Sequence, residues 1–437
     1  MNKPQQYIIS QLKQLILMVC ASLLWVSCGD TNKKDTSDNM NKSTSLSAKD
    51  ILGNPDYLAM SYGGYRQNTR DIQPTIPELK EDMKLLAAIG VKILRTYNVQ
   101  LQQAPNLLKA IRELKNEDSN FEMYVMLGAW IDCQNAWTDL EPNHEVESEK
   151  NAGEIERAVT LANEYPDIIK IIAVGNEAMV RWAASYYVQP NVILKWVNYL
   201  QELKKSGQLS KDLWVTSSDD FSSWGGGDHS YRTTDLENLI RAVDYVSMHT
   251  YPMHNSYYNP EFWVTPDKEQ NLSGLEKVDA AMLRAINFSQ KQYNDVSNYI
   301  KSIDATKTIH IGESGWATVS NGHYGKNGSR AADEYKAGRF YNLMREWTNQ
   351  ERISLFYFEA FDEHWKDHRN RKGSENHFGL FTIDGQAKFG LWSIVDSKSF
   401  KGLTRDGNDI IKTYSGNKEE LMKDVLVPDK QVNAIHD

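Results

Sequence analysis

Two glutamates that follow short apolar runs are the residues of this chain best placed for acid–base chemistry. Glu177 is separated from the run Ile171–Val174 by two residues, and Glu313 is separated from Ile309–Ile311 by one glycine. Two carboxyl groups at one site can divide the work, because burial and like charge separate their pKa values. Retaining glycosidases use such a pair about 5–5.5 Å apart. A lone glutamate at a strand end is more often a salt-bridge or helix-cap residue, so the prediction of a glycosidase depends on the pair.

The pair can act together only if the fold brings both runs to one edge. Strand-like and helix-like runs alternate from residue 57 onward. Strands are predicted at 57–62, 91–97, 121–127, 168–174, 213–216, 243–248, 308–311 and 353–358. Helices are predicted at 76–89, 107–114, 155–165, 192–203, 236–242, 278–303 and 333–347. We expect a single (β/α)8 TIM barrel of the α/β class, because a doubly wound sheet would need a phosphate loop that Gly63–Gly64 does not supply.

Polar and aromatic residues gather where the predicted strands end, which is where barrels carry their chemistry. Such groups are costly to bury without partners, so their concentration at one rim indicates a site. Asn176 is placed to hydrogen-bond a sugar hydroxyl beside the breaking bond. Aromatic rings there suit stacking on a pyranose, although each tryptophan suits the core equally well. The candidate substrate-binding residues are Tyr62, Arg95, Tyr97, Trp130, Asn176, His249, Tyr251, Trp316, Glu359, Glu363 and Lys366.

Composition and motifs exclude several other classes of function. The net charge is -9 and no long basic stripe is present, which excludes a nucleic-acid partner. The three cysteines form no disulfide framework. His249 and His254 are five residues apart with no third ligand in view, so no metal is expected. Glycines 225–227 lack the Lys-Ser/Thr ending of a P-loop and are expected to be a flexible loop tip, and no cofactor is expected.

The N-terminus has the pattern of a bacterial export signal. Two lysines precede the apolar run Leu15–Val26, which suits a signal peptide and is short for a membrane span of about 20 residues. Ser27-Cys28-Gly29 then resembles a lipobox, which predicts lipidation of Cys28; the alternative is a plain secretory peptide. Gly29 stands where an aspartate would retain a lipoprotein in the inner membrane, so we expect anchoring in the outer membrane, on its periplasmic or surface side.

The predicted organisation has three parts. Residues 1–27 form the signal peptide, 28–50 a polar flexible tether, and 51–437 the catalytic domain.

Three blocks of the sequence resemble the signatures of glycoside hydrolase family 17, the β-1,3-glucanase family of clan A. They are Val174–Glu177, Glu313–Trp316 and Phe358–Lys366. Further similarities are Arg95-Thr96-Tyr97, Thr250-Tyr251-Pro252 and His377–Phe381, and the resemblance covers residues 57–391. It implies a retaining mechanism with Glu177 as acid/base and Glu313 as nucleophile. It also implies roles near the substrate for Tyr97, Tyr251, Glu363 and Lys366.

The sequence departs from the family pattern at two positions. Ala317 and His364 stand where relatives often have proline. Neither change removes a carboxylate, but both can reshape the sugar subsites. Long loops at 132–150, 180–190, 251–274 and 318–330 leave endo or exo action open.

Three functions remain to be weighed. The resemblance favours an endo-acting hydrolase of laminarin-like β-1,3-glucan, and we expect the protein to be a monomer. A β-1,3-glucan transglycosylase would share the covalent intermediate but pass the sugar to a second glucan instead of to water. A lipoprotein that only binds glucan would be expected to lack one carboxylate, and both are present.

Overall fold

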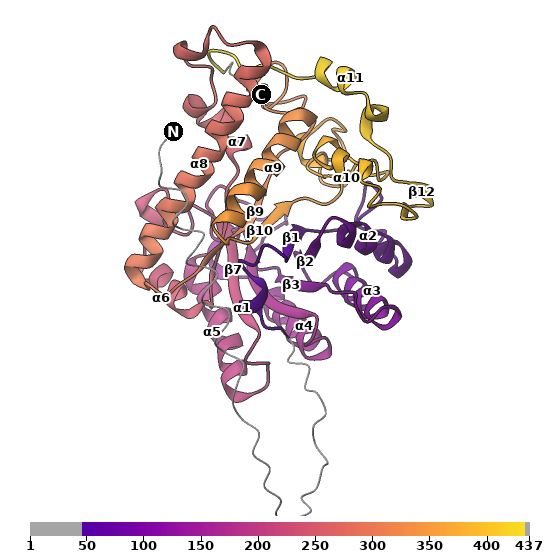
Figure 1. The fold of residues 1–437 in the computed structure, drawn as a ribbon. Helices are drawn as coiled ribbons and strands as arrows, with labels where there is room; N and C mark the ends of the chain where they lie inside the picture. The colour runs from indigo at the N-terminus through magenta and orange to yellow at the C-terminus, as the bar shows by residue number, and fades with distance from the viewer. Residues whose placement is uncertain (1–45, 433–437) are drawn as a thin grey trace, which may run out of the picture. The chain divides into compact units, whose positions relative to one another are not determined.

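The computed structural model describes residues 46–432, and its centre is a closed barrel of eight parallel strands (Figure 1). The order around the barrel is β1-β10-β9-β8-β7-β6-β3-β2. The strands are β1 (Leu58–Ser61), β2 (Val91–Arg95), β3 (Tyr124–Ala129), β6 (Ile169–Asn176), β7 (Trp214–Asp220), β8 (Val246–His249), β9 (Ile309–Gly315) and β10 (Leu355–Phe358). The predicted TIM barrel is confirmed. The predicted signal peptide and Cys28 lie outside the described residues.

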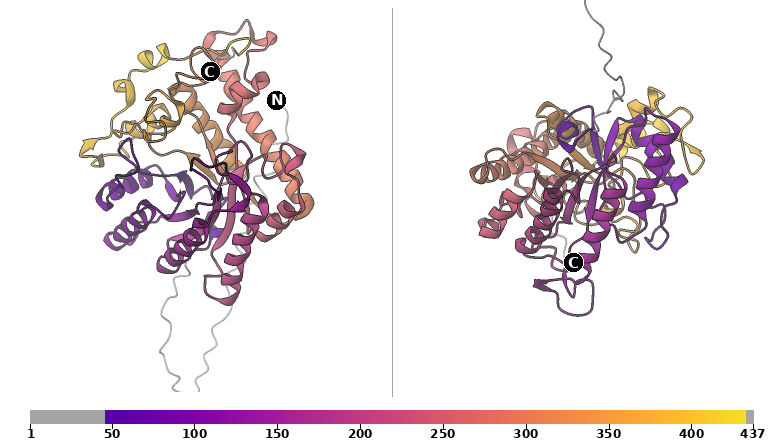
Figure 2. Two further views of the ribbon diagram at one scale, coloured as in Figure 1. Left: turned by 180° about the vertical axis from the view of Figure 1, so that it is seen from behind. Right: turned by 90° about the horizontal axis from the view of Figure 1, so that it is seen from below.

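Helices surround the strands and form the outer layer of the barrel (Figures 1 and 2). Those that connect successive strands are α2 (Ile76–Ala88), α3 (Gln103–Glu117), α4 (Lys150–Glu164), α5 (Pro190–Ser206), α6 (Thr234–Ala242), α8 (Gly274–Ile303) and α9 (Glu334–Gln350). Capping residues set several of their limits. Thr75 and Glu78 form a capping box at the start of α2, and Gly207, with φ +80°, ends α5 in the left-handed conformation.

Shorter helices and strands lie in the segments that connect the barrel strands and in the segment that follows β10. They are β4 (Cys133–Gln134), β5 (Asn143–Glu147), η1 (His229–Tyr231), α7 (Pro252–Tyr258), η2 (Pro260–Phe262), η3 (Asp267–Glu269), η4 (Ser374–Asn376), η5 (Phe389–Leu391), α10 (Trp392–Asp396), β11 (Thr404–Arg405), β12 (Asn408–Asp409), η6 (Thr413–Gly416) and α11 (Lys418–Lys423). Asp384 and Gly385 lie in a tight turn, across which the N–H of Thr382 donates to the carbonyl of Gln386 at 2.9 Å. In residues 46–432 no helix is long and apolar enough to cross a membrane.

The interior of the barrel is filled by apolar side chains from alternate strand positions. Ile93, Met126, Ile171 and Phe356 are fully buried there. Ala48 and Ile51 from α1 (Ala48–Ile51) join the same cluster. The prediction that the flexible tether runs to residue 50 is therefore wrong at its last residues, because they form a helix that packs on the core.

Strands β6, β7 and β9 run further toward the barrel mouth than predicted. Each continues past its last apolar residue, to Asn176, Asp220 and Gly315. The polar residues at these strand ends still pair with the neighbouring strands. Each strand therefore continues beyond the last apolar residue of its sequence pattern. These extensions carry the candidate site.

Candidate active site

Glu177 and Glu313 lie next to each other at the mouth of the barrel. One carboxylate oxygen of each and one ring nitrogen of His249 all lie within 4.8 Å of one another. Nδ1 of His249 is 3.0 Å from Oε1 of Glu177 and 3.7 Å from Oε2 of Glu313. This spacing suits the retaining arrangement, since inverting enzymes keep their carboxyl groups about 6.5–9.5 Å apart.

A sharp bend in the last residues of β6 places Glu177. Gly175 has φ +81°, and a Cβ atom there would lie 2.8 Å from Cβ of Ala178, so only glycine fits. Glu177 itself has φ +47°, a conformation that is uncommon for residues with a side chain. Its backbone N–H donates to the carbonyl of Ser218 on the adjacent β7, at 2.9 Å. The neighbouring strand thus stabilises an otherwise unfavourable backbone at the functional residue.

Both carboxylate oxygens of Glu313 accept hydrogen bonds from charged or phenolic donors. Arg95, from β2, donates to Oε1, and Tyr251 donates to Oε2 at 2.7 Å. Arg95 also donates to the carbonyl of Gly312 at 3.0 Å and to Oδ1 of Asn176 at 2.5 Å. Hydrogen bonds to the charged form favour ionisation, and a buried guanidinium adds a permanent positive charge.

The two carboxyl groups have opposite pKa shifts. Burial, with the neighbouring carboxyls of Glu313 and Asp220, raises the pKa of Glu177 well above its usual range. Burial also opposes ionisation of Glu313, but the charge of Arg95 and the hydrogen bonds from Tyr251 and Arg95 outweigh it, so that pKa is lowered. Because burial lowers the pKa of His249 to about 4, the imidazole is neutral at pH 7 and Arg95 is the cation that keeps Glu313 ionised. The site therefore holds one protonated and one ionised carboxyl.

A hydrogen-bonded chain of serines fixes the His249 ring. Nε2 of His249 lies 2.8 Å from Oγ of Ser218, which lies 2.9 Å from Oγ of Ser247. The hydroxyls occupy the space above Gly312, where a Cβ atom would lie 2.2 Å from Oγ of Ser247. These serines were not among the predicted site residues, and only their place on β7 and β8 could have indicated them.

A second ionic cluster follows β10. Nζ of Lys366 lies 2.5 Å from Oε1 of Glu359 and 3.5 Å from Oε2 of Glu363. Nε1 of Trp365 donates to Oε2 of Glu363 at 3.0 Å. Burial raises the pKa of Glu359 well above its usual range, and although burial opposes the charge on Lys366, Glu359 and Glu363 raise the pKa of that amine. Lys366 is thus a cation held between two carboxyls at the rim.

Aromatic side chains extend from the Glu177 side of the site toward solvent. Trp137, on the turn between β4 and β5, stacks on Tyr186 with ring centroids 5.1 Å apart, and Trp130 lies 5.2 Å from Tyr186. Trp130 directly follows β3, which pairs with β6, so this group lies on the side of the barrel that carries Glu177. Burial and the nearby carboxyl of Glu177 raise the pKa of Tyr186. Trp137 is 63% exposed, so the cluster offers rings to a ligand. We call Trp130, Trp137 and Tyr186 the aromatic platform.

Two predicted substrate-binding residues are instead core residues. Trp316 is fully buried against Trp263 and Phe340, and its Nε1 donates to the carbonyl of Ala331 at 2.8 Å. Tyr62 is buried, with its hydroxyl 2.9 Å from Oδ2 of the buried Asp82. Neither ring has a face for a sugar, so both predictions were wrong.

The other predicted residues come together at the mouth in two layers. Four are buried: Arg95 and His249, which contact the carboxyl pair, and Glu359 and Glu363, which contact Lys366. Glu363 is therefore set back from the residues that line the mouth. Those that line the mouth nearer to solvent, where contact with substrate stays a prediction, are Tyr97, Trp130, Asn176, Tyr251 and Lys366.

Two groups of side chains have the spacing of metal ligands. Besides Glu177, His249 and Glu313, donor atoms of Asp362, His364 and His377 lie within 4.8 Å of one another. In each group a buried cation already neutralises a carboxylate. Arg95 contacts Glu313, and Nζ of Lys388 lies 2.7 Å from Oδ1 of Asp362. Each group thus already contains an ion pair with a basic side chain.

Comparison with known proteins agrees with this geometry. Residues 59–379 match the family model of the BtgE/BtgC glycoside hydrolase domain. The chain belongs to this glycoside hydrolase family. The crystal structure of an endo-laminarinase from Formosa Hel1_33_131 is 63% identical with a TM-score of 0.87, and the match covers 90% of this chain and 100% of that one.

More distant relatives share the fold or part of their length. A β-1,3-glucanosyltransferase from Rhizomucor miehei, seen with laminaritriose, is 20% identical with a TM-score of 0.52 over 77% of this chain and 96% of its own, which shows a shared fold. A probable glucan endo-1,3-beta-glucosidase btgC of Aspergillus flavus is 24% identical over 83% of this chain. The chain spans 48% of the length of that relative.

Proposed function

We propose that this protein is a retaining glycosidase that cleaves laminarin-like β-1,3-glucan within the chain. The observation that carries the proposal is the pairing of Glu177, with a raised pKa, and Glu313, with a lowered pKa, at a separation typical of retaining enzymes. The family, and the 63% identity to a structure described as an endo-laminarinase, support the substrate class.

In the proposed reaction the ionised Glu313 attacks the anomeric carbon while Glu177 gives its proton to the departing glycosidic oxygen. The products of this step are a glycosyl ester on Glu313, a carboxylate on Glu177 and a shortened glucan. The Glu177 carboxylate then takes a proton from the water that attacks the anomeric carbon, and the ester bond breaks. Both glutamates return to their first protonation states.

The neighbours of the pair suit this sequence of steps. Arg95 and Tyr251 donate to different oxygens of Glu313, so the donor on the oxygen that bonds to the sugar loses its charged acceptor, while the other donor keeps the carbonyl oxygen of the ester. Both hydrogen bonds to the carboxylate are restored when the ester is hydrolysed. Oδ1 of Asn176 accepts from Arg95, which leaves its NH2 group for the 2-hydroxyl of the sugar. The leaving glucan departs on the side of the acid, where the aromatic platform can hold it, and this favours cleavage inside a chain.

The catalytic pair is tested with two substitutions. Glu313→Gln is expected to lower laminarin cleavage by a factor of about 10³ or more, because the covalent step is lost. Glu177→Gln is expected to abolish laminarin cleavage but to spare the first step on a glucoside with an activated leaving group, with azide accepted in place of water. Thermal melting checks that both variants fold. A Glu313→Gln protein that cleaves laminarin normally would contradict the mechanism.

The acceptor is tested by chromatography of the products from a laminarin oligosaccharide of defined length. Hydrolysis gives only shorter products. Products longer than the starting chain would show transfer to glucan, and the transglycosylase alternative would replace hydrolysis.

We also propose that Cys28 is lipidated and anchors a monomeric enzyme to the outer membrane of a bacterium, on the basis of Ser27-Cys28-Gly29 after the apolar run. Cys28→Ser is expected to move the protein from the membrane fraction to the soluble fraction of the cell envelope and to abolish incorporation of labelled palmitate. Equal membrane association of the parent and the Cys28→Ser variant would contradict the anchor.

A further inference from the structure

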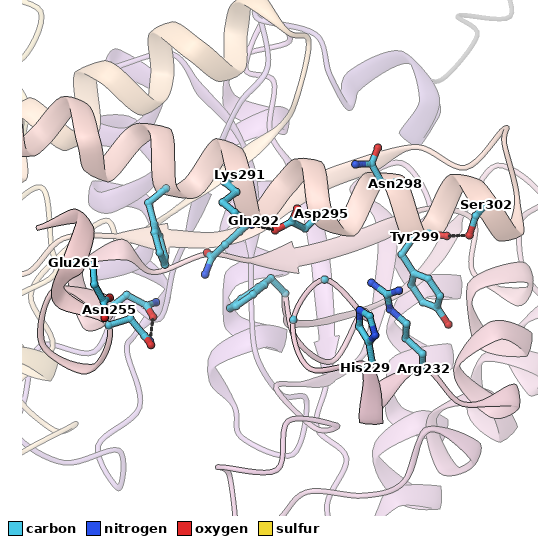
Figure 3. A pocket seen from close by; sticks show the side chains of 15 residues that line it. His229, Arg232, Asn255, Glu261, Lys291, Gln292, Asp295, Asn298, Tyr299 and Ser302 are labelled. Carbon is cyan, nitrogen blue, oxygen red and sulfur yellow. Dashed lines mark hydrogen bonds and ion pairs between the residues drawn. The ribbon is translucent and has the colours of Figure 1, made fainter.

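An open groove with a volume of about 870 Å³ lies outside the barrel wall, between α8 and the segment that follows β7 (Figure 3). Neither Glu177 nor Glu313 lines it. Figure 3 shows Asn255 and Glu261 toward one end, His229 and Arg232 toward the other, and Lys291, Gln292 and Asp295 of α8 between them. The groove therefore follows the length of a helix, as an extended ligand would require.

The groove is formed in advance by close packing of the glycine segment 225–227. A Cβ atom on Gly226 would lie 2.4 Å from Cγ2 of Val296, and one on Gly225 would lie 2.5 Å from the ring of Tyr299. Nε of Arg232 donates to the carbonyl of Gly225 at 2.9 Å. The expectation that these glycines are a flexible loop tip was wrong, because they allow the loop to pack directly on α8.

The lining is rich in side-chain amides and balanced in charge. Amide groups come from Asn255, Asn259, Gln292 and Asn298; the first three also make hydrogen bonds within the protein, and Asn298 is the exposed one. Phenyl rings come from Phe221 and from Phe288, which stacks on Phe262 with ring centroids 4.3 Å apart. Nζ of Lys291 is paired with Oδ2 of Asp295 at 2.5 Å, and the remaining cationic and acidic groups are of both signs. Amides donate to and accept from hydroxyl groups, and rings cover the apolar face of a sugar. A lining of this kind suits a neutral, polyhydroxylated chain and gives no preference to a polyanion.

The back of the groove is in direct contact with the segment that carries the catalytic residues. Oε1 of Gln292 accepts from Oγ1 of Thr250 at 2.6 Å, and Nδ2 of Asn255 donates to the carbonyl of Tyr251 at 3.0 Å. The N–H of Phe221 donates to the carbonyl of His249 at 3.1 Å. Residues 249–251 thus separate the groove from the two glutamates, and a polymer bound in the groove is held close to the barrel mouth.

We propose that this groove is a second carbohydrate site, which binds a neutral β-glucan chain apart from the catalytic residues. The choice of a β-glucan rests on the proposed function. Binding at two places on one polymer makes the second contact intramolecular and raises the effective concentration of substrate. A short oligosaccharide cannot occupy both places, so it gains nothing from the groove.

Steady-state kinetics on long and short substrates test the site. The double variant Phe288→Ala/Asn298→Ala is expected to raise the KM for laminarin about tenfold, the effect of losing roughly one sugar-stacking contact, with kcat unchanged. Its kinetics on a laminarin tetrasaccharide are expected to equal those of the parent. Asn294→Ala, an exposed asparagine one turn away on α8 that does not line the groove, is the matched control. Equal KM values for parent and double variant on laminarin, or a parallel loss on the tetrasaccharide, would overturn the proposal.

Binding without catalysis separates this proposal from the proposed function. The Glu313→Gln protein is run in native gels that contain laminarin, another neutral β-glucan or a sulfated polysaccharide, with and without the groove substitutions. Retardation by a neutral glucan that the groove substitutions weaken supports the site even if the parent does not cleave laminarin. Two outcomes overturn the proposal of a second carbohydrate site. In one, the groove substitutions leave the retardation by neutral glucan unchanged. In the other, only the sulfated polymer retards the protein, and salt abolishes that retardation. Asn298→Ala alone, at an exposed position, is the second variant should Phe288→Ala impair folding.

Discussion

Arg95, together with the hydrogen bond from Tyr251, favours ionisation of Glu313 over ionisation of Glu177. Its guanidinium is almost wholly buried, contacts Glu313 and Asn176, and remains charged at every pH at which the protein is folded. Glu177 receives no such contact, so burial dominates its pKa. Two chemically identical side chains thus obtain different roles from an arginine and a tyrosine that donate to only one of them.

Replacing this cation should change the pH dependence of catalysis. With Arg95→Met, the pKa of Glu313 rises, so ionised Glu313 is lost at a higher pH and the acidic limb of the kcat/KM profile on laminarin moves upward. The rate at the optimum should fall by a factor of about 10²–10³, as for other buried groups that stabilise charge at the reacting atoms. Arg345→Met, another buried arginine, which donates to the carbonyl of Ala59, is the matched control. It should lower the melting temperature and leave the acidic limb in place; an unmoved limb in Arg95→Met would contradict this role.

The hairpin β4–β5 was not predicted from the sequence, and it contributes a ring to the aromatic platform beside the catalytic pair. Its backbone is tied to the loop after β6, because the N–H of Cys133 donates to the carbonyl of Tyr186 at 3.0 Å. It brings Trp137 to the aromatic platform on the acid side. We expect the hairpin to bind the leaving part of the glucan.

Removing one ring from the hairpin tests this role. Trp137→Ala should lower kcat/KM on laminarin about tenfold, the value of a stacking contact, mainly through KM. The ring is mostly exposed, so the melting temperature should change little. Leu140→Ala, an equally exposed apolar residue in the same turn, is the control and should leave both quantities unchanged. Normal binding of laminarin by Trp137→Ala would show that the platform lies off the path of the substrate.

The barrel and its two glutamates could be predicted because they follow from local pattern: apolar runs of strand length alternate with amphipathic helices, and the glutamates end two of the runs. The β4–β5 hairpin could not, since its five-residue second strand is polar and largely exposed. The error at Trp316 has a different origin. Its burial depends on Trp263 and Phe340, which are distant in sequence, and no local pattern shows that three elements meet there.

For the whole molecule, the density of buried ionisable groups at the mouth makes stability depend on pH in two directions. Burial raises the pKa of Asp219 to about 7, so its cost to folding grows as pH rises from 3.8 toward 7. Burial lowers the pKa of His249 and His310 to about 4, so their cost grows as pH falls from 6.5 toward 4. Buried groups at the site thus have opposite effects on how the free energy of unfolding varies with pH. A substitution away from the site is needed to measure the contribution of a single group.

The contribution of His310 can be measured separately, because this residue contacts neither catalytic glutamate. It lies in β9, and its Nδ1 accepts a hydrogen bond from the N–H of Ser354 at 3.0 Å. In the folded protein it stays neutral until pH falls to about 4, whereas the unfolded chain binds the proton near pH 6.5. The free energy of unfolding of the parent should therefore fall by up to about 3 kcal/mol between pH 6.5 and 4 on account of this residue. His310→Asn retains an acceptor but cannot be protonated, so urea titrations should show that its stability falls less over the same range. His229→Asn, at an exposed histidine, is the control and should follow the parent. Parallel curves for the parent and His310→Asn would mean that His310 is not held neutral by burial.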